Sequence, residues 1–321
     1  MSFALESLPL RCPLDQHSLE SLFDQQALTC PQCHRVVPIQ NGIPRFVEDA
    51  HLESFGTQWT RYDVAHEQED RRTFEAKTGF RRDELKGKRV LDAGCGGGRY
   101  TRLVAAAGGY VSAVDHTRAV DKAVELCRDE SANNSEQIQF LQADLKNLPF
   151  APASFDYVFS IGVMHHDEET RAVFNAVARL VKPGGYYSVW LYRRNQEWQE
   201  KINNWLRCRT TTMPQERLEK WSRRGAILGR IPLLNRVANK VVNFSSHPNH
   251  ENRVCDTFDW YAPQYQHHHT IAELLDWYES AGFHNLEVLP PEKTGYLYNW
   301  AYDKDLIIGS GVNVRGQRPV D

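Results

Sequence analysis

The chain has 321 residues, of which 25% are charged and 41% hydrophobic, and its formal net charge is −3. This composition is typical of a globular protein with one large domain and an appendage, and it excludes fibrous, collagenous and wholly disordered classes. No apolar run approaches the roughly 20 residues of a membrane-spanning helix, and the start of the sequence lacks the pattern of a secretion signal. We therefore expect a cytoplasmic protein.

Residues 1–48 form the first predicted unit, a small module that contains three of the seven cysteines. The pair Cys30 and Cys33 has the two-residue spacing of a metal knuckle, and Cys12 and Asp15 repeat this spacing with a carboxylate in the fourth place. Zinc accepts sulfur and carboxylate ligands, so the candidate metal site is Cys12, Asp15, Cys30 and Cys33, with His17 or His34 as alternative fourth ligands. A metal-free remnant held together by packing is the other interpretation, and in both cases the expected role is structural.

Alternating strand and helix patterns begin at Lys86. The expected strands, each a short apolar run, are 89–91, 110–114, 138–141, 155–161, 186–192, 284–289 and 297–308. Segments with the apolar spacing of a helix lie between several of these strands, and one of them carries Val173, Val177 and Leu180 on one face. This alternation predicts an α/β fold over residues 49–321, a Rossmann-like, doubly wound and mostly parallel sheet of seven strands.

A glycine-rich turn follows the first of these strands. Gly94, Gly96 and Gly98 have the spacing G-x-G-x-G, and Asp115 follows Gly94 by 21 residues, at the end of the second strand. In a doubly wound sheet this separation delivers a carboxylate to a ribose diol. The extra negative charge of Asp92 would repel a pyrophosphate but suits an ammonium and a sulfonium, which favours S-adenosylmethionine over NAD. The alternative is a turn that only lets helix and strand approach closely.

Five motifs in order carry a resemblance: VLDAGCGGGR, VDHT, QADLKNLPF, SFDYVFSIGVMHH and LVKPGGYYSVW. They resemble class I S-adenosylmethionine-dependent methyltransferases of the ubiquinone and menaquinone biosynthesis type. The similarity covers about residues 86–192, and GTQW at 56–59 and DWYAP at 259–263 extend it. The resemblance implies cofactor contacts from Asp92, Gly94, Gly96, Asp115, Asp144, Leu145 and Ile161, and from Gln58 and Trp59 on a covering N-terminal helix.

Two histidine pairs are candidates for the proton transfer that a hydroxyl acceptor requires. His165 and His166 follow the fourth strand, and we expect His166 to face the acceptor and His165 to be structural. Alternation in an extended segment places His267 and His269 on one side, and the resemblance implies that they and the preceding segment cap the site. A surface loop with helix-capping histidines is the alternative for this second pair.

A helical insertion is predicted at 193–255, followed by a substrate-capping segment at 256–282. Residues 193–242 contain twelve Lys or Arg and four Glu, a local charge of +8, with three tryptophans among them. This pattern fits a lid over an anionic or lipophilic small molecule, or a peripheral contact with an acidic membrane surface. A helical pair that balances the acidic remainder of the chain is the alternative. Nucleic acid is disfavoured, because the chain as a whole is not basic.

The leading hypothesis is S-adenosylmethionine-dependent methylation of a small molecule at oxygen or nitrogen. The Asn/Asp-Pro-Pro-Tyr/Phe sequence common to enzymes that methylate amides and exocyclic amines is replaced by Ser160–Val163. An RNA or protein acceptor is the first alternative, because residues 37–46 resemble the zinc-ribbon proteins that activate transfer-RNA and release-factor methyltransferases. A non-catalytic, cofactor-binding regulator is the second.

Overall fold

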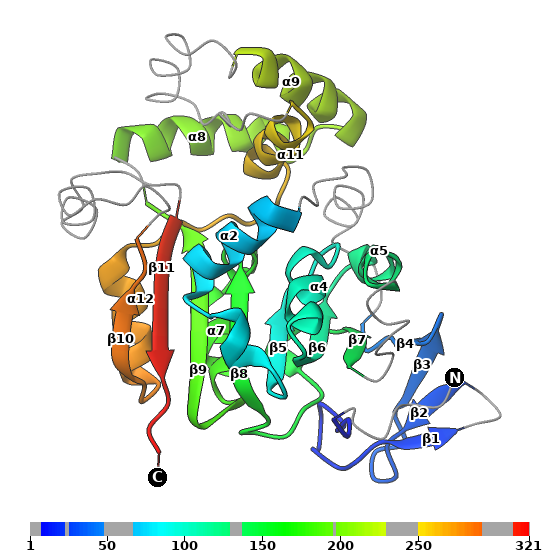
Figure 1. Cartoon of the computed structure of the whole chain (residues 1–321). Helices are drawn as coiled ribbons and strands as arrows, with labels where there is room; N and C mark the ends of the chain where they lie inside the picture. The colour runs from blue at the N-terminus through cyan, green and yellow to red at the C-terminus, as the bar shows by residue number, and fades with distance from the viewer. Residues whose placement is uncertain are drawn as a thin grey trace.

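The computed structural model describes residues 8–22, 26–47, 67–128, 137–194, 197–228, 250–290 and 311–320. A seven-stranded sheet with the order β10-β11-β9-β8-β5-β6-β7 forms its centre (Figure 1). The parallel strands are β5 (Arg89–Ala93), β6 (Tyr110–Asp115), β7 (Ile138–Gln142), β8 (Phe155–Ile161) and β9 (Val181–Tyr192). At one edge β11 (Gly311–Gln317) runs antiparallel to both β9 and β10 (His284–Val288). The predicted Rossmann-like, mostly parallel sheet is confirmed.

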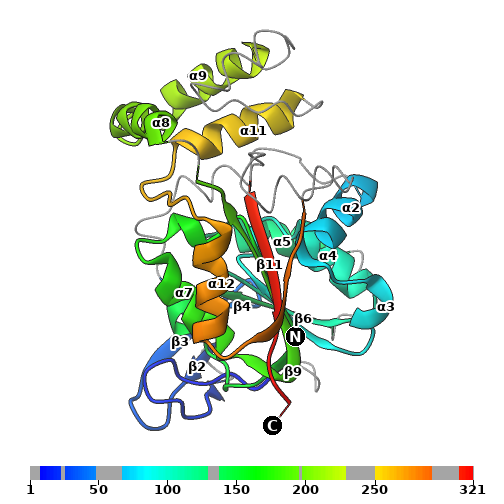
Figure 2. The same ribbon diagram turned by 90° about the vertical axis from the view of Figure 1, so that its left-hand side faces the viewer.

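Helices cover both faces of the sheet (Figure 2). One layer contains α2 (Glu67–Thr78), α3 (Arg82–Leu85), α4 (Arg99–Ala106) and α5 (Ala119–Leu126), and the other α7 (Thr170–Ala178) and α12 (Ile271–Ser280). Each layer buries its apolar stripe in a separate cluster, with Phe74 and Val104 in the first and Phe174 and Trp277 in the second. Burying one such side chain contributes about 1.5–3 kcal/mol, so the two clusters hold the sheet rigid between them.

The start and end of α12 match the sequence pattern. Thr270 Oγ1 accepts a hydrogen bond from the Glu273 amide at 3.2 Å, and the Thr270 amide donates to Glu273 Oε2 at 2.8 Å. Gly282, in the left-handed region at φ +81°, follows the helix. The predicted capping box is confirmed.

The last strand of the sheet differs from the prediction. Residues 297–308 lie outside the described part of the chain, and the strand that pairs with β9 is β11. A Cβ on Gly311 would lie 2.2 Å from Trp190, and one on Gly316 would lie 2.7 Å from Tyr278. Aromatic rings crossing the strand thus require glycine there, and glycine weakens the local strand signal. β9 also starts five residues before the predicted 186, with Gly184 and Gly185 inside it.

Three helices form a layer above the carboxyl ends of β8 and β9 (Figure 1), which we call the helical cap: α8 (Glu197–Thr210), α9 (Gln215–Leu228) and α11 (His250–Tyr261). The boundary predicted between 255 and 256 falls inside α11. The buried guanidinium of Arg207 donates to the carbonyls of Trp260 at 2.8 Å and Pro263 at 2.7 Å, which fixes α8 to the segment after α11. In the described ranges, no helix combines the length and apolarity that crossing a bilayer demands.

The N-terminal module is a four-stranded antiparallel sheet of β1 (Glu20–Leu22), β2 (Ala27–Thr29), β3 (Val36–Gln40) and β4 (Ile43–Pro44). It meets the large sheet at β7. The Phe46 amide donates to the Gln142 carbonyl at 2.8 Å, and the buried Arg45 guanidinium donates to Gln142 Oε1 at 3.0 Å and to Asp121 Oδ1 at 2.6 Å. The module is therefore docked by specific polar contacts rather than tethered by its linker alone.

Candidate active site

A cavity of about 270 Å³ opens at the carboxyl ends of the parallel strands. Residues from the loops after β5, β6, β7 and β8 line one half: Gly94, Gly96, Asp115, Asp144, Leu145 and Ile161. Residues from β9, α2 and α11 line the other half: Trp190, Tyr192, Lys77, Asp256 and Asp259. Open α/β sheets bind ligands at this edge, in the crevice where the strand order reverses, which here lies between β5 and β8.

Gly94 of the glycine loop leaves no space for a side chain. At Gly94 φ is +97°, and a Cβ would lie 2.3 Å from Val163 Cγ2. The amides of Gly94 and Cys95 both donate to the Val114 carbonyl, at 2.8 and 2.9 Å, which ties the loop to β6. The loop thus presents bare backbone to the cavity, as the close approach of a ligand requires.

Asp115 lies at the centre of the hydrogen bonds on this side of the cavity. Its Oδ2 accepts from the Gly96 amide at 2.8 Å, and its Oδ1 accepts from the amide and hydroxyl of Thr117 at 2.9 and 2.7 Å. Across the floor Asp144 Oδ1 accepts from the Lys146 amide at 2.9 Å, which turns the chain so that Leu145 faces the cavity. Carboxylates and an apolar side chain in this order match a ribose diol and a purine ring.

Asp92 lies behind the loop and is not among the residues that line the cavity. It is 2% exposed, and its Oδ2 accepts a 2.6 Å hydrogen bond from Thr101 Oγ1 on α4. Burial raises the pKa of Asp92 to about 7, with Asp115 adding to the rise. The structure thus places the Asp92 side chain against α4 and not on the cavity wall, where a direct cofactor contact was expected.

Asp92→Asn is expected to stabilise the cofactor-free protein at pH 8 and to have little effect at pH 4. Between the unfolded pKa near 3.8 and the folded pKa near 7, the native state retains a proton that the unfolded state has lost, so stability falls as pH rises through this window. Asparagine removes that dependence and still accepts from Thr101. Thermal melting at several pH values measures it, and parallel curves for the two proteins would contradict the expectation.

His166 lies on the cavity wall beside two side chains that the sequence did not single out. Its Nδ1 is 3.2 Å from the Tyr265 carbonyl oxygen, and its Nε2 is 3.7 Å from Asp259 Oδ2. The Tyr192 hydroxyl donates to the same Asp259 oxygen at 2.5 Å. Because a carbonyl only accepts, Nδ1 carries the proton in neutral His166, and Nε2 faces the carboxylate of Asp259.

His165 lies behind this wall and is fully buried. Its ring stacks on Tyr192 with centroids 4.0 Å apart, and burial, assisted by the neighbouring histidines, lowers its pKa well below the usual value. It therefore stays neutral and fills space beneath Tyr192.

The structure does not bring His267 and His269 to the cavity wall. The His269 amide donates to the Tyr192 carbonyl at 2.8 Å, and the His267 amide donates to the His165 carbonyl at 2.8 Å. This pairing with the end of β9 places the His269 ring against Trp277, at 4.9 Å between centroids, and burial lowers its pKa to about 4. The structure thus places this pair beside the end of β9, joined to it by an isolated bridge at His269, and not on the wall of the pocket that it was expected to cap.

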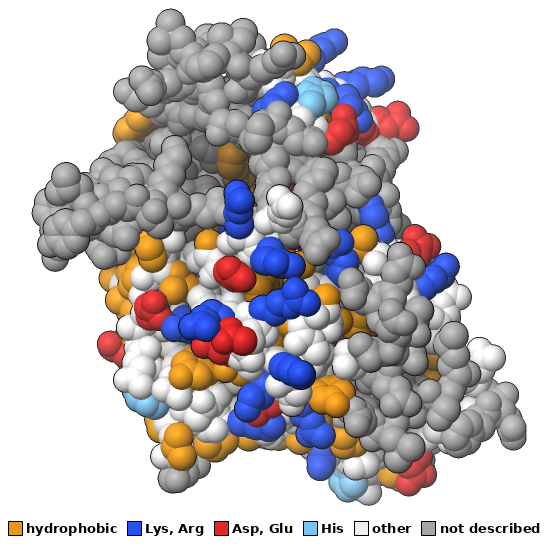
Figure 3. Space-filling model, in the orientation of Figure 1, with side chains coloured by type: hydrophobic (Ala, Val, Ile, Leu, Met, Phe, Trp, Pro, Cys, Tyr) orange, Lys and Arg blue, Asp and Glu red, His pale blue; other side chains and the backbone are white. Residues whose placement is uncertain are grey.

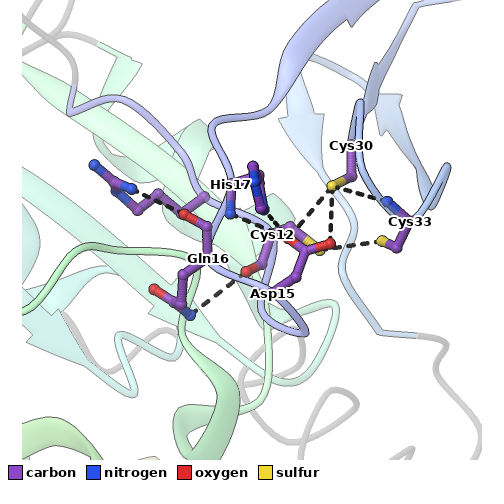
Figure 4. Close-up of polar contacts among 7 residues, drawn as sticks. Cys12, Asp15, Gln16, His17, Cys30 and Cys33 are labelled. Atoms are coloured by element: carbon purple, nitrogen blue, oxygen red, sulfur yellow. Dashed lines mark hydrogen bonds and ion pairs between the residues drawn. The ribbon is translucent and has the colours of Figure 1, made fainter.

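The remaining predicted residues lie elsewhere. Gln58 and Trp59 fall outside the described part of the chain. Cys12, Asp15, Cys30 and Cys33 come together in the N-terminal module, where their ligand atoms lie within 4.8 Å of one another (Figure 4). None of the four lines the cavity.

Residues 91–189, which run from β5 to β9 and contain the glycine loop, match the family model described as Methyltransferase domain. The chain is 31% identical over 125 residues to the Ubiquinone biosynthesis O-methyltransferase of Idiomarina loihiensis, which covers 39% of this chain and 48% of that protein. It is 30% identical over 113 residues to O-methyltransferase rstn1 of Aspergillus nomiae, covering 35% and 49%. The chain thus spans about half the length of these relatives.

Among solved structures, the chain is similar to the Haemonchus contortus phospholethanolamine N-methyltransferase 2 in complex with phosphomonomethylethanolamine and S-adenosylhomocysteine. The TM-score is 0.44 at 17% identity, over 78% of this chain and 52% of that one.

Proposed function

We propose that the protein transfers a methyl group from S-adenosylmethionine to a hydroxyl oxygen of a small molecule. This proposal rests on one observation: residues that suit the cofactor and residues that could act on the acceptor line the same cavity. The glycine loop, Asp115 and Asp144 suit an adenosyl ligand. Beside them Tyr192 donates a hydrogen bond to Asp259, whose carboxylate lies 3.7 Å from His166 Nε2. Both relatives named above are O-methyltransferases, which supports the choice of oxygen.

The residues of the cavity fit S-adenosylmethionine. Bare backbone at Gly94 admits a ligand where any Cβ would collide with Val163, and Asp115 presents carboxylate oxygens at the end of β6. The cofactor supplies a methyl group on a sulfonium, the electrophile of the reaction. The carboxylates of Asp115 and Asp259 on the wall of this cavity give it the negative character that a cationic ligand requires.

His166 acts as the general base in this proposal. Its Nε2 would take the proton of the acceptor hydroxyl, whose oxygen would receive the methyl group that the bound sulfonium supplies. The carboxylate of Asp259, 3.7 Å from Nε2, stabilises the imidazolium that forms. The Tyr265 carbonyl fixes the ring orientation through Nδ1, and Trp190 and Met164 supply apolar surface for the acceptor.

Calorimetry with S-adenosylhomocysteine tests the cofactor half of the proposal, and incubation with labelled cofactor and a metabolite extract tests the acceptor half. We expect binding with a 1:1 stoichiometry and one labelled small molecule, resolved by mass spectrometry, that carries the methyl group on oxygen. If RNA or protein is labelled and no small molecule is, the acceptor is a macromolecule and the proposed acceptor class is wrong. Binding without any labelled product would favour a regulator.

We also propose that the helical cap contacts an anionic membrane surface. Four of the seven exposed large hydrophobic side chains in the described ranges are on α8 and α9: Trp198, Trp205, Trp221 and Ile227. The Arg209 guanidinium stacks on Trp205 at 3.9 Å, and Lys and Arg side chains project from the described part of the cap at the upper right of Figure 3. Exposed tryptophan among basic residues is typical of surfaces that bind anionic lipid, and a bilayer would present a lipophilic acceptor near the cavity.

Replacing both Trp198 and Trp205 by serine is expected to weaken binding to anionic vesicles at least about tenfold, because each indole loses apolar contact with the bilayer. Sedimentation with phosphatidylglycerol vesicles at low salt measures this. Val320→Ser, which removes another exposed apolar side chain at the far end of the chain, is the matched control. Absence of binding by the unmodified protein would remove the membrane contact, and binding to RNA instead would assign the basic surface to nucleic acid.

A further inference from the structure

The N-terminal module contains a second group of reactive side chains that methyl transfer does not use. Two turns, Cys12–Asp15 and Cys30–Cys33, lie against each other and direct three thiols and one carboxylate to a common point (Figure 4). We propose that Cys12, Asp15, Cys30 and Cys33 bind one zinc ion in a tetrahedral Cys₃Asp site with a structural role.

The separations between the ligand atoms have the size of a zinc tetrahedron. Cys12 Sγ lies 3.5 Å from Cys33 Sγ, and Cys30 Sγ lies 3.3 Å from Asp15 Oδ2. Because zinc–sulfur bonds are about 2.3 Å long, the sulfurs of a tetrahedral site lie about 3.8 Å apart. A disulfide would require about 2.05 Å, and all three cysteines are free. The side chains therefore already surround a space that one ion fills.

The backbone of the two turns is equivalent, although one ends in aspartate. The Gln16 amide donates to the Cys12 carbonyl at 2.9 Å, and the His34 amide donates to the Cys30 carbonyl at 3.0 Å. Gln16 at φ 63° and His34 at φ 58° both adopt the left-handed conformation directly after the second ligand. Such a conformation is unfavourable for residues with a Cβ. Two strained turns of the same shape, facing each other, indicate a requirement for four convergent ligands.

The structure also distinguishes among the possible fourth ligands. In the described part of the module, the clustered ligand atoms include the Asp15 carboxylate and neither His17 nor His34. His17 instead supports the carboxylate: its amide donates to Asp15 Oδ1 at 3.1 Å, and its Nδ1 lies 3.4 Å from the same oxygen. An outer partner of this kind orients a ligating group. Three thiolates favour zinc over magnesium or calcium, which prefer oxygen ligands.

A zinc ion at this place would tie together the segments on both sides of the β1–β2 hairpin. Leu10 and Leu28, next to the two turns, are buried in the same apolar cluster as α7 and α12. The Arg11 amide donates to the Pro149 carbonyl of the large domain at 2.9 Å. Loss of the ion is thus expected to loosen the docking of the module on β7, without removing any residue from the cavity.

Metal analysis and cobalt substitution of the full chain test the proposal. We expect about one zinc per chain after purification, since a structural site holds one ion. Cys30→Ser and Asp15→Ala are expected to weaken zinc binding at least ~100-fold, because loss of a ligand exceeds the effect of losing an outer partner. Cys208→Ser, which replaces an exposed cysteine on α8, is the matched control and retains the ion.

Asp15→Cys provides the sharpest measurement. In the cobalt-loaded protein, the thiolate-to-cobalt charge-transfer absorbance is expected to rise by about one third, because four sulfur ligands replace three. An unchanged absorbance would overturn the role of Asp15, and a folded protein that contains no zinc and takes up no cobalt would overturn the site. Binding of S-adenosylhomocysteine, measured in parallel, separates these outcomes from failure of the proposed methyl transfer.

Discussion

Asp115→Ala is expected to weaken binding of S-adenosylhomocysteine at least about 100-fold, because a hydrogen bond to a charged group is worth about 1.5–3 kcal/mol and a ribose offers two hydroxyls. The carboxylate also accepts from the amide of Gly96 and from Thr117. The substitution thus removes the ribose contact together with the bonds that hold the glycine loop.

Calorimetry of the folded variants measures this effect. Asp115→Asn keeps one accepting oxygen and is expected to fall between the alanine variant and the unmodified protein. Asp83→Ala is the matched control, because Asp83 is an exposed aspartate on α3 that pairs with Arg81. Equal affinities for Asp115→Ala and Asp83→Ala would show that the ribose does not bind at the end of β6.

The half of the cavity that Gly94, Gly96 and Asp115 line was predictable because its determinants are local. A strand, a glycine turn and a carboxylate at the next strand end lie within 30 residues of sequence, and the parallel topology brings them to one edge of the sheet. The other half was not predictable in this way. Tyr192 and Asp259 are 67 residues apart, and His166 and Tyr265 are 99 apart. Only the folding of the helical cap over β9 brings them together.

The same distinction between local and distant determinants explains which strands of the fold were predictable from the sequence. Parallel strands such as β6 and β8 are buried apolar runs and were located from the sequence. β11 was missed because its glycines meet the rings of Trp190 and Tyr278, which come from distant elements. The contact of Arg45 with Gln142 was equally hidden, since no local pattern links residues 97 apart. That contact shows that the module and the large domain form one packed unit at β7.

The arrangement of His166 and Asp259 leads to the second large effect. His166→Ala is expected to lower kcat for the acceptor found in the extract by about 10²–10⁴-fold, the usual contribution of a general base. Affinity for S-adenosylhomocysteine should stay the same, because His166 acts on the acceptor. His284→Ala, which replaces an exposed histidine on β10, is the matched control.

A substitution at Asp259 distinguishes an effect on catalysis from an effect on packing. Asp259→Asn still accepts from the Tyr192 hydroxyl but removes the charge beside His166 Nε2, so kcat is expected to fall while the fold and cofactor affinity remain. Because the two residues act on one proton, the double variant His166→Ala/Asp259→Asn should be about as slow as His166→Ala alone. Strictly multiplicative losses would instead mean that Asp259 contacts the acceptor independently, and an unchanged kcat in His166→Ala would require another base.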